Sequence, residues 1–193
     1  MILVDAVYIL NYGGLVVMNR IIGELVSSGL PHTVLLDDRH KVEGNRVIVR
    51  YGLFARYRFY KKYIHKYSCV ICLGNIPPPV KCNINVFLFF HNVNLLNKND
   101  VITRLKRVII KLHIMNCSEV IVQTDLVAKN FVQKIGPARP ISIHPVFDEG
   151  IIEWSKPKVC SSDVLKLFYP SSSVPHKNHS LLLKNGSLTQ RIA

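Results

Sequence analysis

The sequence has 193 residues and a formal net charge of +13, with 49% hydrophobic and 19% charged residues. Such an apolar chain can bury a core, so its composition excludes general disorder. The length fits one α/β domain plus a fragment better than two complete domains. The excess of cations predicts attraction to phosphate on nucleic acid, an anionic membrane or a nucleotide, and it does not choose among them.

The N-terminus Met1–Asp5 lacks the basic start of a signal peptide, and no apolar run approaches the roughly 18 to 20 residues that span a bilayer. We therefore expect a cytoplasmic protein. Five scattered cysteines fit reduced thiols better than a disulfide framework. Cys69 and Cys72 have the spacing of a redox or zinc site, but they lie in a strand-like apolar run. We favour core thiols there and expect no metal site.

Strand and helix patterns alternate along most of the chain. Predicted strands span Ile2–Leu10, His32–Asp37, Arg46–Val49, Cys69–Leu73, Val86–Phe90, Glu119–Gln123 and Ile141–Ile143. Predicted helices span about Val16–Val26, Phe54–Tyr67, Asp100–Met115 and Thr124–Ile135, with Thr124 as an N-cap. This order predicts an α/β fold, a doubly wound, mostly parallel Rossmann-like sheet with helices on both faces.

The residue composition divides the chain into three segments. Residues 1–147 carry the alternating pattern and form the predicted Rossmann-like domain. Residues 148–163, with Gly, Pro, Lys and paired Ser, suit a connector. An apolar strand pattern restarts at 164, so residues 164–193 read as the start of an incomplete second domain, with a truncated or frameshifted end.

Gly13 and Gly14 follow the first predicted strand, where backbone amides at a helix start can face a ligand. Making the turn would explain both glycines equally well. A nicotinamide-cofactor site is an alternative, because Asp37 and Asp38 end the second strand. It is disfavoured, since the G-x-G-x-x-G spacing is absent.

His91 and Asn92 follow the apolar strand Val86–Phe90, at the carboxyl end where open α/β sheets bind ligands. A polar pair is costly to bury there without partners, and it is well placed in a cleft. A purely structural histidine is the alternative. Because both lie after strands of one parallel sheet, we expect His91 and the Gly13-Gly14 turn to share a sheet edge.

Taken in order, these segments resemble the retaining glycosyltransferases of the GT-B fold. The matching elements are Gly13-Gly14, His91-Asn92, Val120–Thr124, His144–Phe147 and Pro175–His179. The resemblance implies that His91 binds the acceptor or supports the reaction centre, and that Asn92 and Thr124 line the acceptor side or cleft. It also implies donor-phosphate contacts for Gly13, Gly14 and Lys177, although Lys177 could be a solvated turn lysine. His144 departs from the family's usual Asn, and the family's donor-site glutamate pair has no room in this sequence.

Residues 50–67 form a basic stretch rich in aromatic residues on the second predicted helix. Phe59, Tyr60, Tyr63 and Tyr67 lie on or near one side of it, as at a lipid headgroup boundary. The cations expected to face a membrane are Arg56, Arg58, Lys61, Lys62 and Lys66. Lys106, Arg107 and Lys111 would extend this positive surface.

Two alternatives stay open for this stretch. Its aromatic rings could pack on the sheet while the charges are solvated, or the rings could stack single-stranded RNA bases. The membrane is preferred over nucleic acid because the resemblance implies a sugar acceptor, which is often lipid-linked.

The predicted function is transfer of a sugar from a nucleotide-diphosphate sugar to a glycan or lipid-linked acceptor in polysaccharide biosynthesis, without a cofactor or metal. We expect the chain alone to be inactive, because most donor contacts are missing. We expect a cytoplasmic location, peripheral on the inner face of the cell membrane. The alternative is a non-catalytic basic α/β module that binds RNA or an anionic membrane.

Overall fold

The computed structural model describes residues 1–9, 12–40, 46–136 and 139–145. These residues belong to one compact unit, residues 1–148. The predicted connector and the second-domain start, with Lys177, lie outside the described residues. Half of the His144–Phe147 element also lies outside them, since only His144 and Pro145 are described.

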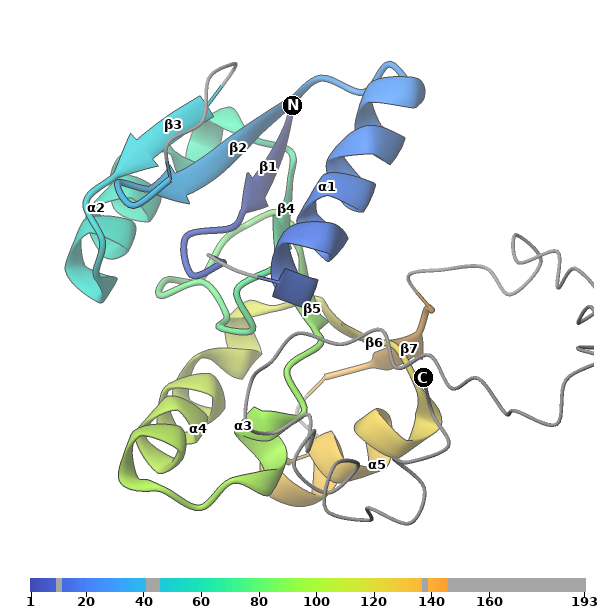
Figure 1. Cartoon of the computed structure of the whole chain (residues 1–193). Coiled ribbons are helices and arrows are strands. Elements are labelled where there is room, and N and C mark those ends of the chain that lie inside the picture. The colour runs from blue at the N-terminus through green and yellow to red at the C-terminus, as the bar shows by residue number, and fades with distance from the viewer. Residues whose placement is uncertain (10–11, 41–45, 137–138, 146–193) are drawn as a thin grey trace, which may run out of the picture. The chain divides into compact units, whose positions relative to one another are not determined.

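Seven parallel strands form one sheet in the order β3-β2-β1-β4-β5-β6-β7 (Figure 1). The strands are β1 Ile2–Asp5, β2 His32–Asp37, β3 Arg46–Val49, β4 Cys69–Cys72, β5 Asn85–Phe90, β6 Glu119–Val122 and β7 Ile141–Ile143. The chain builds the sheet outward from β1 to β3, then crosses back to β4 and continues to β7. The order therefore reverses between β1 and β4, and ligands bind at such a switch point in open α/β sheets.

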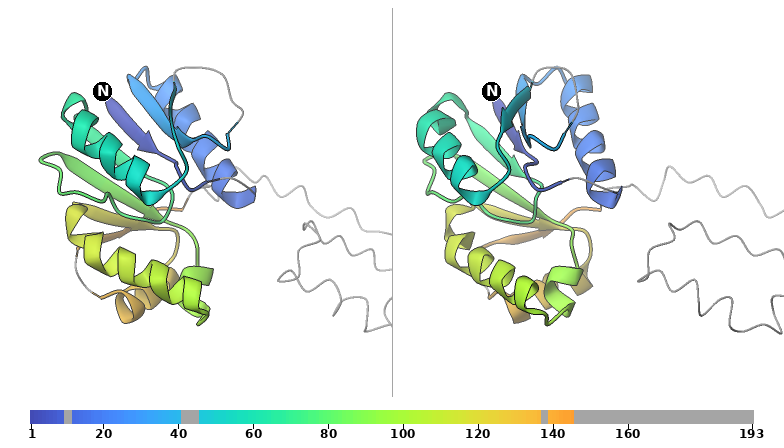
Figure 2. Two further views of the ribbon diagram at one scale, coloured as in Figure 1. Left: turned by 90° about the vertical axis from the view of Figure 1, so that its left-hand side faces the viewer. Right: turned by 60° about the vertical axis from the view of Figure 1, so that its left-hand side comes forward.

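Helices cover both faces of the sheet. They are α1 Tyr12–Ser27, α2 Leu53–Tyr63, α3 Asn94–Asn97, α4 Val101–His113 and α5 Asp125–Lys134, with single 3₁₀ turns at Ile64–Lys66 and Ile114–Asn116. Helix α1 packs on one face, and α2, α4 and α5 pack on the other. Figure 2 shows α2 and α4 on the same side of the sheet. The predicted fold class is confirmed, with every strand pair parallel.

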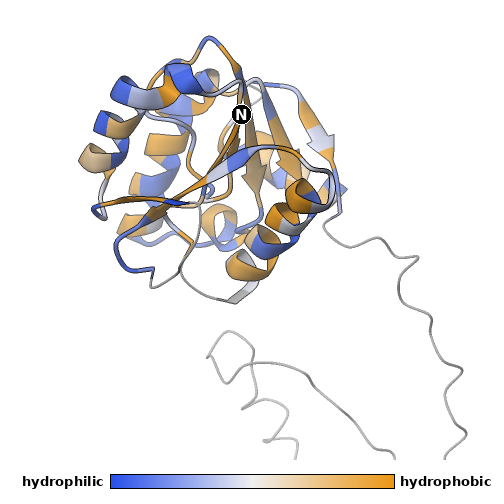
Figure 3. Cartoon of the chain, turned by 90° about the horizontal axis from the view of Figure 1, so that it is seen from above, coloured by the Kyte–Doolittle hydropathy of each residue, from blue (hydrophilic) through white to orange (hydrophobic). Residues whose placement is uncertain are grey.

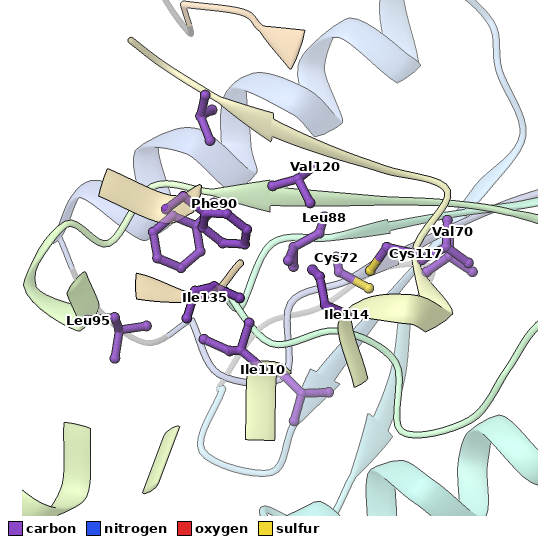
Figure 4. Packing of buried hydrophobic residues seen from close by; sticks show 14 of the residues in the cluster. Val70, Cys72, Leu88, Phe90, Leu95, Ile110, Ile114, Cys117, Val120 and Ile135 are labelled. Atoms are coloured by element: carbon purple, nitrogen blue, oxygen red, sulfur yellow. The ribbon is translucent and has the colours of Figure 1, made fainter. Parts of the chain in front are cut away.

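Two apolar clusters follow from the alternation of side chains along the strands. On the α1 face, Val17 and Met18 meet Val4 and Leu36. The larger cluster on the other face joins the strands to α2, α4 and α5, and Figure 4 shows part of it. Cys72 packs in this larger cluster, which confirms the prediction of a core thiol at that position.

Several predicted boundaries were wrong. Strand β1 ends at Asp5, because Asp5 Oδ1 accepts the backbone N–H of Val7 and the chain then turns. Helix α1 begins at Tyr12, so Gly13 and Gly14 lie in its first turn and not in a turn before it. Asp100 does not belong to helix α4. It is the N-cap, and its carboxylate accepts the backbone N–H of Thr103.

The N-cap prediction for α5 is confirmed. The Thr124 hydroxyl accepts the backbone N–H of Val127, and α5 begins at Asp125. The short helix α3 was not predicted, because four residues are too few to show an apolar period.

Candidate functional site

Asn75 organises the carboxyl edge of the sheet at the switch point. It follows β4, is buried, and has a backbone φ of 60°, a left-handed conformation that Asn tolerates better than most residues. Its Oδ1 accepts the backbone N–H groups of His91 at 2.8 Å and Asn92 at 3.0 Å. The loop after β4 is thereby bonded to the loop after β5, and the two residues that follow β5 are held in place.

His91 lies beside the start of α1. A Cβ atom placed on Gly14 would be 3.6 Å from His91 Nε2 and 3.1 Å from Cγ2 of Ile9, whereas one on Gly13 would meet nothing within 4 Å. Glycine at position 14 thus leaves room for the imidazole at the helix start. The prediction that His91 and the Gly13-Gly14 segment share one sheet edge is confirmed.

The His91 ring is held in one tautomer when neutral. Because Asn75 Oδ1 accepts two backbone N–H groups, its Nδ2 faces His91 Nε2, at 3.4 Å. That amide nitrogen can only donate, so Nε2 accepts and the ring proton lies on Nδ1. Burial lowers the pKa of His91, and the Phe89 backbone partly opposes this effect. In this tautomer Nε2 is the acceptor nitrogen of the ring, so a hydroxyl would have to replace the Asn75 amide there to form a hydrogen bond with it.

Arg56 was predicted to face a membrane, and this prediction was wrong. Its side chain is only 2% exposed, and its guanidinium contacts Asp5 Oδ2 through Nε and Nη2, each at 2.8 Å. The hydroxyl of Tyr60 donates to the same carboxylate oxygen at 2.6 Å. Burial, the largest single influence, would lower the pKa of Arg56, but Asp5 together with Tyr60, Cys72 and Tyr8 outweighs it, so the pKa is raised and the guanidinium stays charged.

The Arg56 guanidinium also fixes the loop that carries Asn75. Its Nη1 donates to the carbonyl of Pro77 at 2.8 Å, and its Nη2 donates to the carbonyl of Ile76 at 3.0 Å. A chain of contacts therefore runs from Asp5 through Arg56 to the Ile76-Pro77 backbone, next to Asn75 and His91. Arg56 supports the sheet edge from within the protein.

The aromatic residues of α2 are divided between core and surface. Phe59, Tyr60 and Tyr67 are buried, so the prediction of tyrosine rings at a headgroup boundary was wrong for Tyr60 and Tyr67, and the alternative of packing on the sheet is confirmed for these three rings. The physical reason is that they pack against the β strands in the larger apolar cluster. The remaining predicted cations are exposed, and each rests near an aromatic ring of the same segment. These are Arg58 near Phe54, Lys61 near Tyr57, and Lys62 and Lys66 near Tyr63.

Helix α4 presents apolar side chains on two faces. Thr103, Ile110 and the following Ile114 are buried against the sheet. An outer stripe at spacings of four, three and four residues stays exposed, and its members are Val101 (81%), Leu105 (61%), Val108 (49%) and Leu112 (71%). The outer face of such a helix is normally polar. Figure 3 shows hydrophobic residues on the helices as well as on the sheet.

Of the three cations predicted to extend the positive surface on α4, Arg107 has a structural role. It donates to the carbonyls of Leu96 and Lys98 and to Asn99 Oδ1, which fixes the loop before the helix. Lys106 and Lys111 are exposed. No helix in the described part of the chain is long and apolar enough to cross a membrane.

Asp37, the acid that would bind the ribose of a nicotinamide cofactor, already binds a side chain of the protein. It is fully buried, and Arg39 binds its two carboxylate oxygens at 2.8 and 2.7 Å. Arg39 in turn stacks 3.5 Å from the centre of the Tyr51 ring. Within the described ranges, no three His, Cys, Asp or Glu side chains gather to hold a metal ion.

A pocket of about 410 Å³ opens at the same sheet edge, between the start of α2 and helix α4. Tyr8, Arg39, Tyr51, Asn75 and Asn92 line it from the loops after the strands, and α4 contributes Ile102, Leu105, Lys106 and Ile109. Asn92 therefore joins this pocket, while His91 lies beside Gly14 on the α1 side. Thr124 follows β6 at the same edge but caps α5 and is not part of either group.

Asn75 and Tyr8 were not predicted as site residues. Both follow strands at the carboxyl edge, as His91 does, so strand ends alone could have identified them. The apolar run Val86–Phe90 ends directly before His91 and draws attention to that residue. Neither Tyr8 nor Asn75 directly follows such a run, and the prolines after Asn75 indicated only a loop.

No protein-family model and no curated protein matches the chain. Among solved structures, the fold is similar to sucrose-phosphate synthase from Thermosynechococcus elongatus, with a TM-score of 0.54 and 13% sequence identity. The similarity covers 75% of this chain and 47% of that one, so the chain spans about half the length of that glycosyltransferase. At this identity the likeness shows the fold alone, a Rossmann-like parallel α/β domain of the kind found in a glycosyltransferase.

Proposed function

We propose that this chain is the acceptor-side domain of a glycosyltransferase. In this proposal a nucleotide-diphosphate sugar provides the sugar, and the acceptor is a glycan or a lipid-linked glycan used in polysaccharide biosynthesis. His91 binds the acceptor or supports the reaction centre, Asn92 and Thr124 lie on the acceptor side, and the first turn of α1 at Gly13 and Gly14 faces the donor phosphates. Further donor contacts, including Lys177, come from outside the described residues.

One observation carries the proposal. The His91 imidazole lies beside Gly14 at the carboxyl edge of a parallel sheet, with its Nε2 side held by Asn75. Burial lowers the pKa of His91, which favours the neutral ring at this edge. The backbone amides of the first turn of α1 suit an anion at the same edge.

Calorimetric titration of the purified chain tests this proposal against the alternative. We expect binding of short oligosaccharides that weakens about tenfold or more in His91→Ala, since an interaction of 1.4 kcal/mol is lost for each factor of ten. His65→Ala is the matched control, because His65 is an exposed histidine on the 3₁₀ turn after α2 and lies outside the proposed site. Tight RNA binding with no oligosaccharide binding would favour the non-catalytic module instead. Sugar transfer by this chain alone would contradict its expected inactivity.

We propose in addition that the chain attaches peripherally to anionic membranes through the outer stripe of α4, and not through the inner residues of α2. The stripe is aliphatic, which suits lipid chains better than nucleic-acid bases, because aliphatic side chains do not stack. Neither α2 nor α4 contains an acidic residue. The same cations on a second copy would repel one another, so an anionic bilayer fits this surface better than self-association.

Co-sedimentation with vesicles of neutral or anionic lipid tests the attachment. Val108→Asp combined with Leu112→Asp should abolish binding, and Lys61→Glu with Lys62→Glu should reduce it most at low salt, because each cation contributes about 1 kcal/mol that salt screens. Val26→Asp is the matched control, since Val26 is 63% exposed on α1, which covers the other sheet face. Equal binding of all variants, or of neutral and anionic vesicles, would refute the proposal.

A further inference from the structure

The pocket between α2 and α4 has three polar groups that make no hydrogen bond of standard geometry within the described residues. One is the buried Tyr8 hydroxyl, although the Arg56 guanidinium lies near enough to oppose the rise in its pKa. The side chains of Asn92 and Lys106 likewise show no hydrogen bond or ion pair in that part of the chain, although both line the pocket. A buried hydroxyl left without a partner costs free energy, and such groups are normally satisfied by water or a ligand.

These three groups suit a negatively charged oxygen. Burial raises the pKa of Tyr8 to about 12, so the phenol keeps its proton at neutral pH and can donate it in a hydrogen bond. The Asn92 amide donates as well, and Lys106 brings a full positive charge. Arg39, the other cation in the wall, is already neutralised by Asp37. Lys106 is therefore the cation available to a ligand.

Apolar side chains line the part of the pocket away from these polar groups and extend into a neighbouring hollow. Leu53, Ile76 and Ile109 line the pocket, and they also line a neighbouring hollow of about 410 Å³ between α2 and α4. Phe54, Pro77 and Pro79 add further apolar wall to that second hollow, which Arg56, Tyr57 and His113 also line. Both volumes lie in the range of about 300 to 1,000 Å³ that is typical of small-molecule sites.

We infer that these adjoining hollows bind an anionic amphiphile, with its phosphate group held by Lys106, Asn92 and Tyr8 and its apolar chain along Leu53, Ile76 and Ile109. This inference deepens the proposed function and rests on it, because it makes the acceptor a lipid phosphate whose head lies at the sheet edge that carries His91. Leu105 of the outer stripe also lines the pocket, but Val108 and Leu112 line neither hollow, so variants at these two positions separate attachment to a bilayer from entry into the hollows.

Titration of the full chain with geranyl phosphate, inorganic phosphate and geraniol tests the inference. Geranyl phosphate should bind at least tenfold more tightly than either of the others, since both the charge and the chain contribute. Lys106→Ala should weaken its binding about tenfold, and Tyr8→Phe should weaken it several-fold. Lys111→Ala is the matched control, a cation of the same helix outside the pocket, and it should leave the affinity unchanged.

Melting temperatures separate binding from folding. Tyr8→Phe removes a hydroxyl that makes no hydrogen bond of standard geometry within the described residues, so it should not lower the melting temperature even though it lowers affinity. Equal affinity of geranyl phosphate for the wild type and Lys106→Ala, or inorganic phosphate binding as tightly as geranyl phosphate, would overturn the inference. If geranyl phosphate does not bind while oligosaccharide binding still depends on His91, only the lipid-phosphate inference fails and the proposed function stands.

Discussion

Helices α2 and α4 lie on the same face of the sheet and are both rich in basic and apolar residues. They differ in which of these residues are buried and which are exposed. Helix α2 turns Arg56, Phe59 and Tyr60 inward, where Asp5 neutralises the arginine. Helix α4 has no buried charge and leaves a second apolar stripe, with Leu105 and Leu112, on its outer surface. The difference depends on a strand residue: an acid at the end of β1 draws in the cation of one helix and has no counterpart under the other.

The largest expected effect comes from separating the two arginines of α2. Arg56→Met should lower the free energy of unfolding by about 3 to 5 kcal/mol, because it leaves Asp5 buried without its partner. Arg58→Met, at an exposed position on the opposite side of the helix, should change the free energy of unfolding by less than about 0.5 kcal/mol. Urea unfolding of both variants measures this directly. Similar losses of unfolding free energy in the two variants would mean that the buried Asp5–Arg56 pair does not stabilise the protein more than an exposed arginine of α2.

The same contrast exists within α4, between its inner and outer apolar residues. Ile110 is fully buried and Leu112 is 71% exposed. Ile110→Ala should cost about 2 to 5 kcal/mol through lost burial and a cavity. Leu112→Ala should change stability by less than about 0.5 kcal/mol. Comparable losses in urea unfolding would show that the outer stripe is packed against something, contrary to its exposure.

Much of the fold could be predicted from the sequence, because central parallel strands are continuous apolar runs and their order limits the topology. The shared edge of His91 and Gly14 followed from that topology. The position of Arg56 could not be predicted, because its partner Asp5 lies 51 residues away and a helix pattern does not reveal which cation meets a buried acid. Asn75 was missed for the same reason, since its role depends on contacts with the loop after β5.

A smaller effect is expected at the two glycines in the first turn of α1. Gly14→Ala places a methyl group 3.1 Å from Ile9 Cγ2, which must shift by a few tenths of an ångström, and in ordinary van der Waals contact with His91 Nε2 at 3.6 Å. In Gly14→Ala the imidazole NMR signals of His91 should therefore move, because a methyl group now contacts the ring. Gly13→Ala should leave these signals in place. Unchanged His91 signals in Gly14→Ala would contradict the close approach of α1 to the imidazole.

The smallest effect is a pH dependence of stability from His91. Burial lowers its pKa in the folded protein, so below the ordinary value of about 6.5 the unfolded state takes up the proton more readily. Stability should therefore fall as the pH drops from 7 toward the lowered pKa. His91→Gln should flatten this part of the curve. His113→Gln must be measured alongside, because burial lowers the pKa of His113 as well.

The central claim is that ligands bind at the carboxyl edge of the sheet, around the loops that Asn75 joins. A map of backbone amide NMR shifts, recorded with the tightest-binding oligosaccharide or with geranyl phosphate, tests it most directly. The account predicts that the largest shifts cluster at Gly14, Asn75, His91 and Asn92. Shifts that cluster instead at the amino edge, around Ser68 and Ser118 before β4 and β6, would contradict it.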